Sequence, residues 1–266
     1  LPPGTRCALN LVGVAHTQVQ RGDVVVGPDQ WHLATVVDAS LQVLDQLDHS
    51  VSRRGAYVAY LGAGEHPVRM RILGPEALGP GREGSVRLFL PRSLPLLPGD
   101  RFVLRESGRS ETVGGGCVLD VDPRERASRA RPDLSVDRVV RERGWVDSDE
   151  LELLTGARRE PDVGQWVVDP EALQTTLAEL REALDESGPL GVELSSLDDY
   201  QRAAAVLLDE ATVEGRRLRV TDAADPLIDH PFVAALEATP FAPPAPEGVD
   251  RVELRELVRR GTVVEE

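Results

Sequence analysis

Residues 96–120 read LLPGDRFVLRESGRSETVGGGCVLD. One apolar run precedes a polar segment in this stretch, and a second apolar run follows it. The runs, at residues 100–106 and 117–121, show no helical period and are bounded by glycine and proline, which is typical of β-strands. The three consecutive glycines precede a strand, whereas a dinucleotide-binding loop opens a helix. We therefore expect residues 112–116 to form a tight turn of a β-barrel.

The same pattern covers the rest of the first half of the chain. Apolar runs at residues 7–14 and 24–26 flank a polar turn at residues 21–23, and we expect both runs to be strands. Several short strands in so short a stretch predict a small closed barrel. The other runs lie at residues 33–37, 56–61, 67–73 and 84–90.

The second half carries helical signals instead. Asp169 is a favourable N-cap, Pro170 suits the first helical position, and Gly188 suits the helix end. Leucines recur on one face between these limits, at Leu173, Leu177, Leu180 and Leu184. A long amphipathic helix is therefore expected here.

Short helices followed by a strand or hairpin recur along this half, which is typical of tandem winged-helix modules. The fold class predicted for the chain is thus multi-domain, first β and then mixed α/β. The further expected elements are helices at residues 148–154 and 200–209, a strand at 166–168, a hairpin at 212–220 turning at Glu214 and Gly215, a helix from Asp250 to Gly261 with Glu253 in a capping box, and the start of a strand at Val263 and Val264.

The charge divides the chain at the same place. The 266 residues carry a formal net charge of -15, but residues 1–124 hold 13 arginines and 13 acidic residues, and residues 125–266 hold 17 and 32. Binding phosphates requires clustered cations, so the acidic half is not expected to bind nucleic acid over its whole surface. The two halves are different kinds of domain.

All 30 positive residues are arginine. A Walker A loop and the guanine-reading N-K-x-D element both need lysine, and so does Schiff-base catalysis. The sequence therefore predicts neither a GTPase site nor a bound GTP or Mg²⁺ in this chain.

Other classes of site are excluded on spacing. The five histidines show no metal-ligand spacing, Cys7 and Cys117 are far apart, and no nucleophile and base are paired, so no metal or catalytic residue is predicted. No apolar run approaches the roughly 18 residues of a membrane span. Two cysteines make no disulfide framework, which favours a cytoplasmic location.

Three segments carry a resemblance to a known family: GTRCALNLVGV at residues 4–14, QRGDVV at residues 20–25, and residues 96–120. They resemble the two β-barrels that follow the GTPase domain of translation elongation factors, and are most similar to the selenocysteine-specific family, SelB. The resemblance covers the first 123 residues and implies a fragment without the GTPase domain and the last winged helix. The implied domains are the end of the second barrel at 1–28, the third barrel at 29–123, and winged helices at 124–187, 188–230 and, in part, 231–266.

The resemblance also implies site residues. Arg6 takes the position that lines the pocket for the esterified amino acid, where a guanidinium suits the anionic selenol; the alternative is a solvent-facing strand arginine. Arg105, Glu106 and Arg109 match the segment that touches the T-stem backbone of tRNA. The alternative for them is an ordinary polar hairpin tip.

The function implied is delivery of selenocysteyl-tRNA to the ribosome at UGA codons, by a monomer. GTP and Mg²⁺ would bind the missing GTPase domain of the parent GTPase, and the SECIS hairpin of the mRNA would bind a missing C-terminal module. A regulatory or scaffold protein that joins winged helices to a β-barrel is the alternative. Against it, a DNA-reading winged helix needs a basic face, and this half is acidic.

Overall fold

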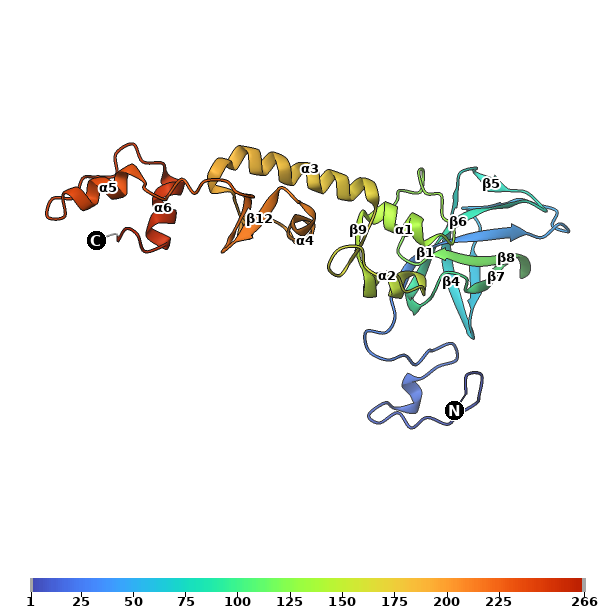
Figure 1. Ribbon diagram of the computed structural model, residues 1–266. Helices are drawn as coiled ribbons and strands as arrows, with labels where there is room; N and C mark the ends of the chain where they lie inside the picture. Colours follow the sequence, from blue (N-terminus) through green and yellow to red (C-terminus); the bar gives the residue numbers. More distant parts are fainter. Residues whose placement is uncertain (1, 265–266) are drawn as a thin grey trace. The chain divides into compact units, whose positions relative to one another are not determined.

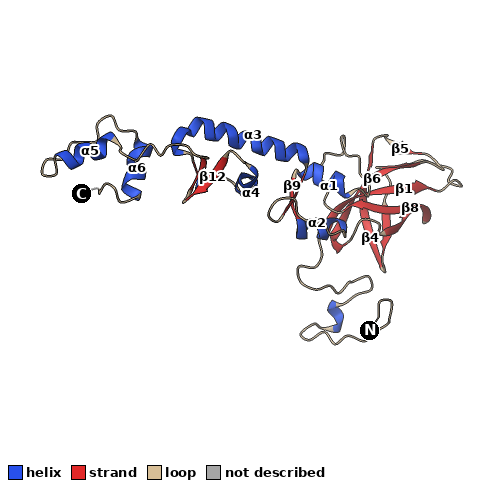
Figure 2. Cartoon of the chain, in the orientation of Figure 1, coloured by secondary structure: helices blue, strands red, loops and turns tan. Residues whose placement is uncertain are grey.

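The computed structural model describes residues 2–264 of the chain. It falls into two compact units, Leu1–Val167 and Val168–Glu266 (Figure 1). The first holds most of the strands and the second most of the helices (Figure 2). The predicted fold class, a β-barrel followed by mixed α/β modules, is confirmed.

Six antiparallel strands form a closed barrel in the order β1-β6-β4-β3-β7-β8. A short pair, β2 and β5, lies beside it. Each run expected between residues 33 and 121 overlaps a strand to within one residue at its ends, or lies inside a longer strand. Their bounds are Leu33–Val43 (β1), Val51–Ser52 (β2), Tyr57–Leu61 (β3), Gly64–Leu73 (β4), Ala77–Leu78 (β5), Glu83–Pro95 (β6), Arg101–Glu106 (β7) and Glu111–Asp120 (β8).

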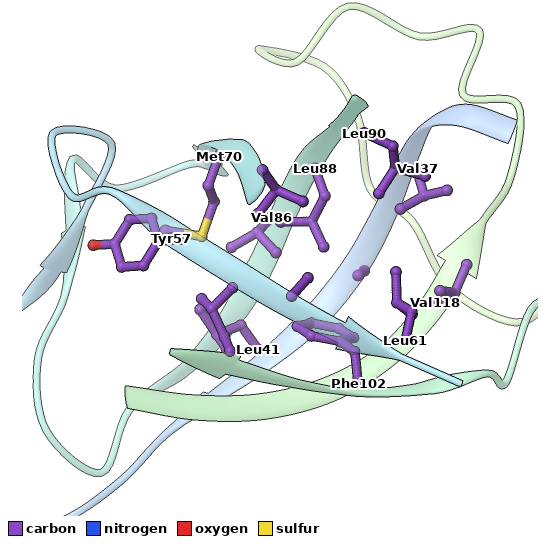
Figure 3. Packing of buried hydrophobic residues seen from close by; sticks show 14 of the residues in the cluster. Val37, Leu41, Tyr57, Leu61, Met70, Val86, Leu88, Leu90, Phe102 and Val118 are labelled. Carbon is purple, nitrogen blue, oxygen red and sulfur yellow. The ribbon is translucent and has the colours of Figure 1, made fainter. Parts of the chain in front are cut away.

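The barrel interior is filled by alternate side chains of the strands (Figure 3). Along β4, buried and exposed residues alternate almost throughout, which is the period of a strand with one face in the core. Val86, Leu88 and Leu104 are fully buried. With few aromatic residues, this core is built mainly from Val and Leu.

The turn expected at residues 112–116 is wrong, because these residues lie inside β8. The chain turns earlier, where Ser110 N–H donates to the Ser107 carbonyl over 3.2 Å. A Cβ on Gly116 would lie 1.9 Å from the Ser40 carbonyl oxygen, and one on Gly114 would lie 2.3 Å from that of Gln42. The glycines are therefore needed for the close approach of β1 and β8 that closes the barrel.

The strands expected at residues 7–14 and 24–26 are also wrong. In the described part of residues 1–32, the one regular element is a 3-10 turn at His16–Gln18. Val12 is 88% exposed, and no strand pairs with these runs among the residues that the structure describes. An apolar run becomes a stable strand only when a sheet pairs with it and covers one face.

A small helical module packs against the barrel within the first unit. Its elements are α1 (Val136–Arg143), β9 (Trp145–Asp147), α2 (Ser148–Thr155) and β10 (Trp166–Val168). The sequence predicted α2 and β10 and missed α1 and β9. Leu154 of α2 joins the barrel core, so the module and the barrel share apolar contacts.

One buried and one partly exposed ion pair join this module to the barrel. Arg138 of α1 donates to Asp120 of β8 over 2.8 Å, and the two side chains are 7% and 5% exposed. Arg143 donates to Asp122 over 3.0 Å. Burial of such charges is tolerated because each has a partner of opposite sign.

The second unit begins with α3 (Pro170–Ser187), which confirms the long helix and its Asp169 cap. The hairpin is confirmed as β12 and β13, and the helix after Asp250 as α6. The helix expected at 200–209 is α4 followed by a 3-10 turn at Ala205–Leu207. The remaining bounds are Val192–Glu193 (β11), Asp199–Ala204 (α4), Ala211–Glu214 (β12), Arg217–Val220 (β13), Pro231–Ala238 (α5) and Arg251–Arg259 (α6).

Val263 and Val264 do not begin a strand, because no strand of residues 2–264 pairs with them; the Val263 amide instead donates to the Leu257 carbonyl at the end of α6. The predicted boundaries of the individual barrel and winged-helix domains stay predictions. No helix within residues 2–264 has the length and apolar character needed to cross a membrane.

Candidate functional site

The β7–β8 hairpin holds three of the four residues that the sequence singled out. Arg105 and Glu106 end β7, and Arg109 lies in the turn. The Arg105 guanidinium donates to the Ser110 carbonyl over 2.9 Å, across the hairpin. The Ser107 amide donates to the Ala56 carbonyl over 2.8 Å and attaches the turn to the segment that enters β3.

A histidine that the sequence did not single out organises this hairpin. His49 Nε2 lies 3.0 Å from Glu106 Oε2, and His49 Nδ1 lies 2.9 Å from Asp48 Oδ1. The Arg109 guanidinium reaches the same two carboxylates at 3.7 and 3.9 Å. The cluster brings two carboxylates, an imidazole and a guanidinium together at the surface.

The charges of the cluster act on one another. The hydrogen bond to Asp48 and then that to Glu106 raise the pKa of His49 above its ordinary value, against partial burial and the repulsion of Arg109. The hydrogen bond from His49 lowers the pKa of Asp48. A protonated imidazolium donates from both ring nitrogens, so the cationic form fits this arrangement.

We expect this histidine to make stability depend on pH. Because the pKa of His49 is raised on folding, its contribution is fully present below the unfolded value of 6.5 and is lost as pH rises through the folded value. The difference in free energy of unfolding between the wild type and His49→Gln should therefore shrink as pH rises above 6.5. Urea unfolding at a series of pH values measures it, and a difference that grows with pH would contradict the assignment.

Arg6 lies apart from this cluster. It is exposed, in the irregular segment before the first strand, and among residues 2–264 no hydrogen bond or ion pair joins it to the hairpin. The structure thus brings together Arg105, Glu106 and Arg109 but not Arg6. His49 and Asp48 were missed because they come from the loop after β1, and only the folded barrel carries that loop to the hairpin.

The described residues contain no group of three or more His, Cys, Asp or Glu that could hold a metal ion. Cys7 and Cys117 are free thiols. What the hairpin does offer is a set of donors at an exposed turn, with Arg109 54% exposed. Guanidinium groups at such a turn are suited to phosphate and ribose oxygens.

Comparison with known proteins gives matches to selenocysteine-specific elongation factors. The β-barrel domain of the selenocysteine-specific elongation factor family matches residues 34–125. The selenocysteine-specific elongation factor of Desulfomicrobium baculatum is 27% identical over 117 residues, which are 44% of this chain and 18% of that protein. The crystal structure of the bacterial selenocysteine-specific elongation factor EF-Sec is similar with a TM-score of 0.61 and 14% identity, covering 93% of this chain and 45% of that one.

The structural likeness, at such low identity, shows the shared fold. The chain spans less than half the length of either relative. The family match coincides with the barrel, whose strands run from β1 to β8, and it includes the hairpin at Arg105. The barrel therefore matches the β-barrel domain of the selenocysteine-specific elongation factor family, and the fold of the chain is similar to that of EF-Sec.

Proposed function

We propose that this chain holds selenocysteyl-tRNA for delivery to the ribosome at UGA codons. The observation that carries the proposal is the β7–β8 hairpin of the barrel that matches the family's β-barrel domain. There Arg109 presents an exposed guanidinium beside Glu106, and Arg105 donates to the Ser110 carbonyl across the hairpin. Backbone contacts of this kind position an RNA without reading its sequence. The T-stem backbone of the tRNA is the ligand that we assign to this hairpin.

Arg6 is assigned to the esterified amino acid. It has no ion pair within the described residues, so its guanidinium is free for an anionic ligand. A selenol is ionised at neutral pH, and a guanidinium binds an anion through charge and through several donors. The assignment needs the segment around Arg6 to adopt a paired conformation in the complete factor.

The remaining partners follow from the same proposal. The α/β modules after the barrel would form an arm toward the message, and a module outside this chain would bind the SECIS hairpin. GTP and Mg²⁺ are assigned to a GTPase domain outside the chain, since the chain has no lysine for a phosphate loop. The factor would act as a cytoplasmic monomer, and the chain itself would not be an enzyme.

The proposal is tested by tRNA binding with two classes of variant. In the complete factor, Arg6→Ala should weaken selenocysteyl-tRNA by about 1.5 to 3 kcal/mol, and seryl-tRNA on the same tRNA body much less, because the variant removes one charge-assisted hydrogen bond to the selenolate. Arg109→Gln should weaken both about equally. Fluorescence anisotropy measures the two affinities.

Two results would contradict the assignments. If Arg6→Ala lowers the affinity for both aminoacyl-tRNAs equally, Arg6 contacts the tRNA body or supports the fold, and it does not bind the amino acid. If Arg109→Gln binds both tRNAs as tightly as the wild type, the hairpin is not part of the surface that binds tRNA. Arg158→Gln is the matched control, because Arg158 is exposed in the helical module after the barrel and pairs with Glu152.

A further inference from the structure

A proline-rich loop joins α5 and α6 in the second unit (Figure 1). Residues 240–246 read PFAPPAP, and residues 239–250 form no helix or strand. Phe241 is 101% exposed, whereas the other three phenylalanines of the chain are buried or half-buried. The loop therefore presents the most exposed aromatic side chain of residues 2–264.

The prolines predispose residues 242–246 to a polyproline II helix. Proline holds φ near the value of this helix, and a residue that precedes proline avoids the α-helical region. A polyproline II helix has three residues per turn, so Pro243 and Pro246 share one edge, and Ala242 and Ala245 share another. Because this stretch is ordered before it meets a partner, binding costs little conformational entropy.

The groups that this loop offers to a partner are a phenyl ring and free backbone carbonyls. The Ala242 amide donates to the Thr239 carbonyl over 3.1 Å, and this turn places Phe241 at the start of the proline stretch. Among residues 2–264, no backbone amide donates to the carbonyls of residues 241–244. A groove lined by Trp and Tyr supplies rings that pack on proline, and N–H and O–H groups that donate to such carbonyls.

The flanks of the loop are acidic. Residues 237–250 contain Glu237, Glu247 and Asp250 but no arginine or lysine. A groove that binds this loop should therefore carry basic residues at its rim, because complementary charges favour association. The same acidic residues disfavour RNA as the ligand, since RNA phosphates would be repelled.

We propose that residues 241–246 bind, as a polyproline II ligand, an aromatic-lined groove on a basic protein of the ribosome. Phe241 is the anchor, and Pro243 and Pro246 pack on the aromatic rings of the groove. A loop that served only as a stiff spacer would need the prolines but not the phenyl ring. The inference rests on the proposed function in that the ribosome is the partner that this function supplies.

The test is a titration of the fluorescein-labelled chain with purified ribosomes, followed by fluorescence anisotropy. Phe241→Ala should raise the Kd by about tenfold, because it removes the aromatic anchor of the interface. Pro243→Ala/Pro246→Ala should raise it by a similar factor, since it removes both the packing edge and the preordered backbone. In a second measurement, p-benzoylphenylalanine replaces Phe241, and irradiation should link the chain to a ribosomal protein that mass spectrometry identifies.

Two controls leave the proposed contacts in place. Ala242→Ser/Ala245→Ser changes the edge of small side chains and keeps every proline, so the Kd should stay close to that of the wild type. Val252→Ala removes a different apolar side chain, 46% exposed on α6, and should also leave the Kd unchanged. Thermal unfolding of each variant checks the fold, which Phe241→Ala should retain because this side chain is fully exposed.

Each outcome supports or overturns the inference. If Phe241→Ala binds ribosomes as tightly as the wild type while the proline variant binds more weakly, the loop acts through its stiffness and the inference is wrong. A cross-link to ribosomal RNA in place of a protein would also overturn it, and so would a wild-type chain that binds no ribosomes. The tRNA titrations of Arg6→Ala and Arg109→Gln leave residues 241–246 unchanged, so they decide the proposed tRNA contacts separately.

Discussion

Gly116→Ala is expected to lower the free energy of unfolding by about 3 kcal/mol or more, because overpacking against backbone cannot be relieved by turning a side chain. The new Cβ would lie 1.9 Å from the Ser40 carbonyl oxygen and 2.6 Å from its carbonyl carbon. Strands β1 and β8 must then separate where the barrel closes. Urea unfolding followed by far-UV circular dichroism, analysed by linear extrapolation, measures the decrease.

Gly108→Ala is the matched control in the same hairpin. Nothing lies within 4 Å of a Cβ placed there, and its φ is not in the left-handed region, so the change should be close to neutral. Equal stability of the two variants would contradict the role given to the glycines of β8.

Arg138→Met is expected to destabilise the protein by about 3 to 5 kcal/mol, because it leaves the buried Asp120 carboxylate without its cation. Arg138 is 7% exposed and also pairs with Glu142 at 2.8 Å, so water cannot readily replace it. Unfolding should become less cooperative if the helical module separates from the barrel first. The same urea titration, with tryptophan fluorescence as a second probe, detects this.

Removing the charge that is left behind should restore part of the stability. The double variant Arg138→Met/Asp120→Asn is expected to be more stable than Arg138→Met alone, since an amide is less costly to bury than an unpaired carboxylate. Arg158→Met removes an exposed pair with Glu152, whose side chains are 65% and 44% exposed, and should cost no more than about 1 kcal/mol. If Arg138→Met costs as little as this control, the buried pair does not fasten the module to the barrel.

The elements predicted best are those whose signals are local. Asp169 caps α3 by accepting from the Glu171 and Ala172 amides, and Gly188 follows its last residue. Asp250 caps α6 in the same way. In the barrel, the alternation along β4 follows from its own sequence, because each side chain is directed to one face by its place in the strand.

The errors and omissions have a common cause, which is contact between segments distant in sequence. The glycines of residues 112–116 are typical of a turn by their local sequence. In the structure they lie in β8, where they allow the close approach of β1. The helix α1 was missed because its short polar sequence, VDRVVRER, is anchored by ion pairs to Asp120 and Asp122 of the barrel. The apolar run at residues 7–14 has strand propensity but no paired partner within the described residues.

The sequence by itself determined the strands between residues 33 and 121, the capped helices α3 and α6, the charge division at residue 124 and the family resemblance of the hairpin at Arg105. These depend on residue identity and on spacing over a few residues, which hydrogen bonding and side-chain period convert directly into local structure. Tertiary structure alone decided that His49 lies within hydrogen-bonding distance of Glu106 and that Arg138 of α1 pairs with Asp120 of β8. Barrel closure joins residues tens of positions apart, and the free energy that selects those contacts comes from packing the whole core rather than from any one segment.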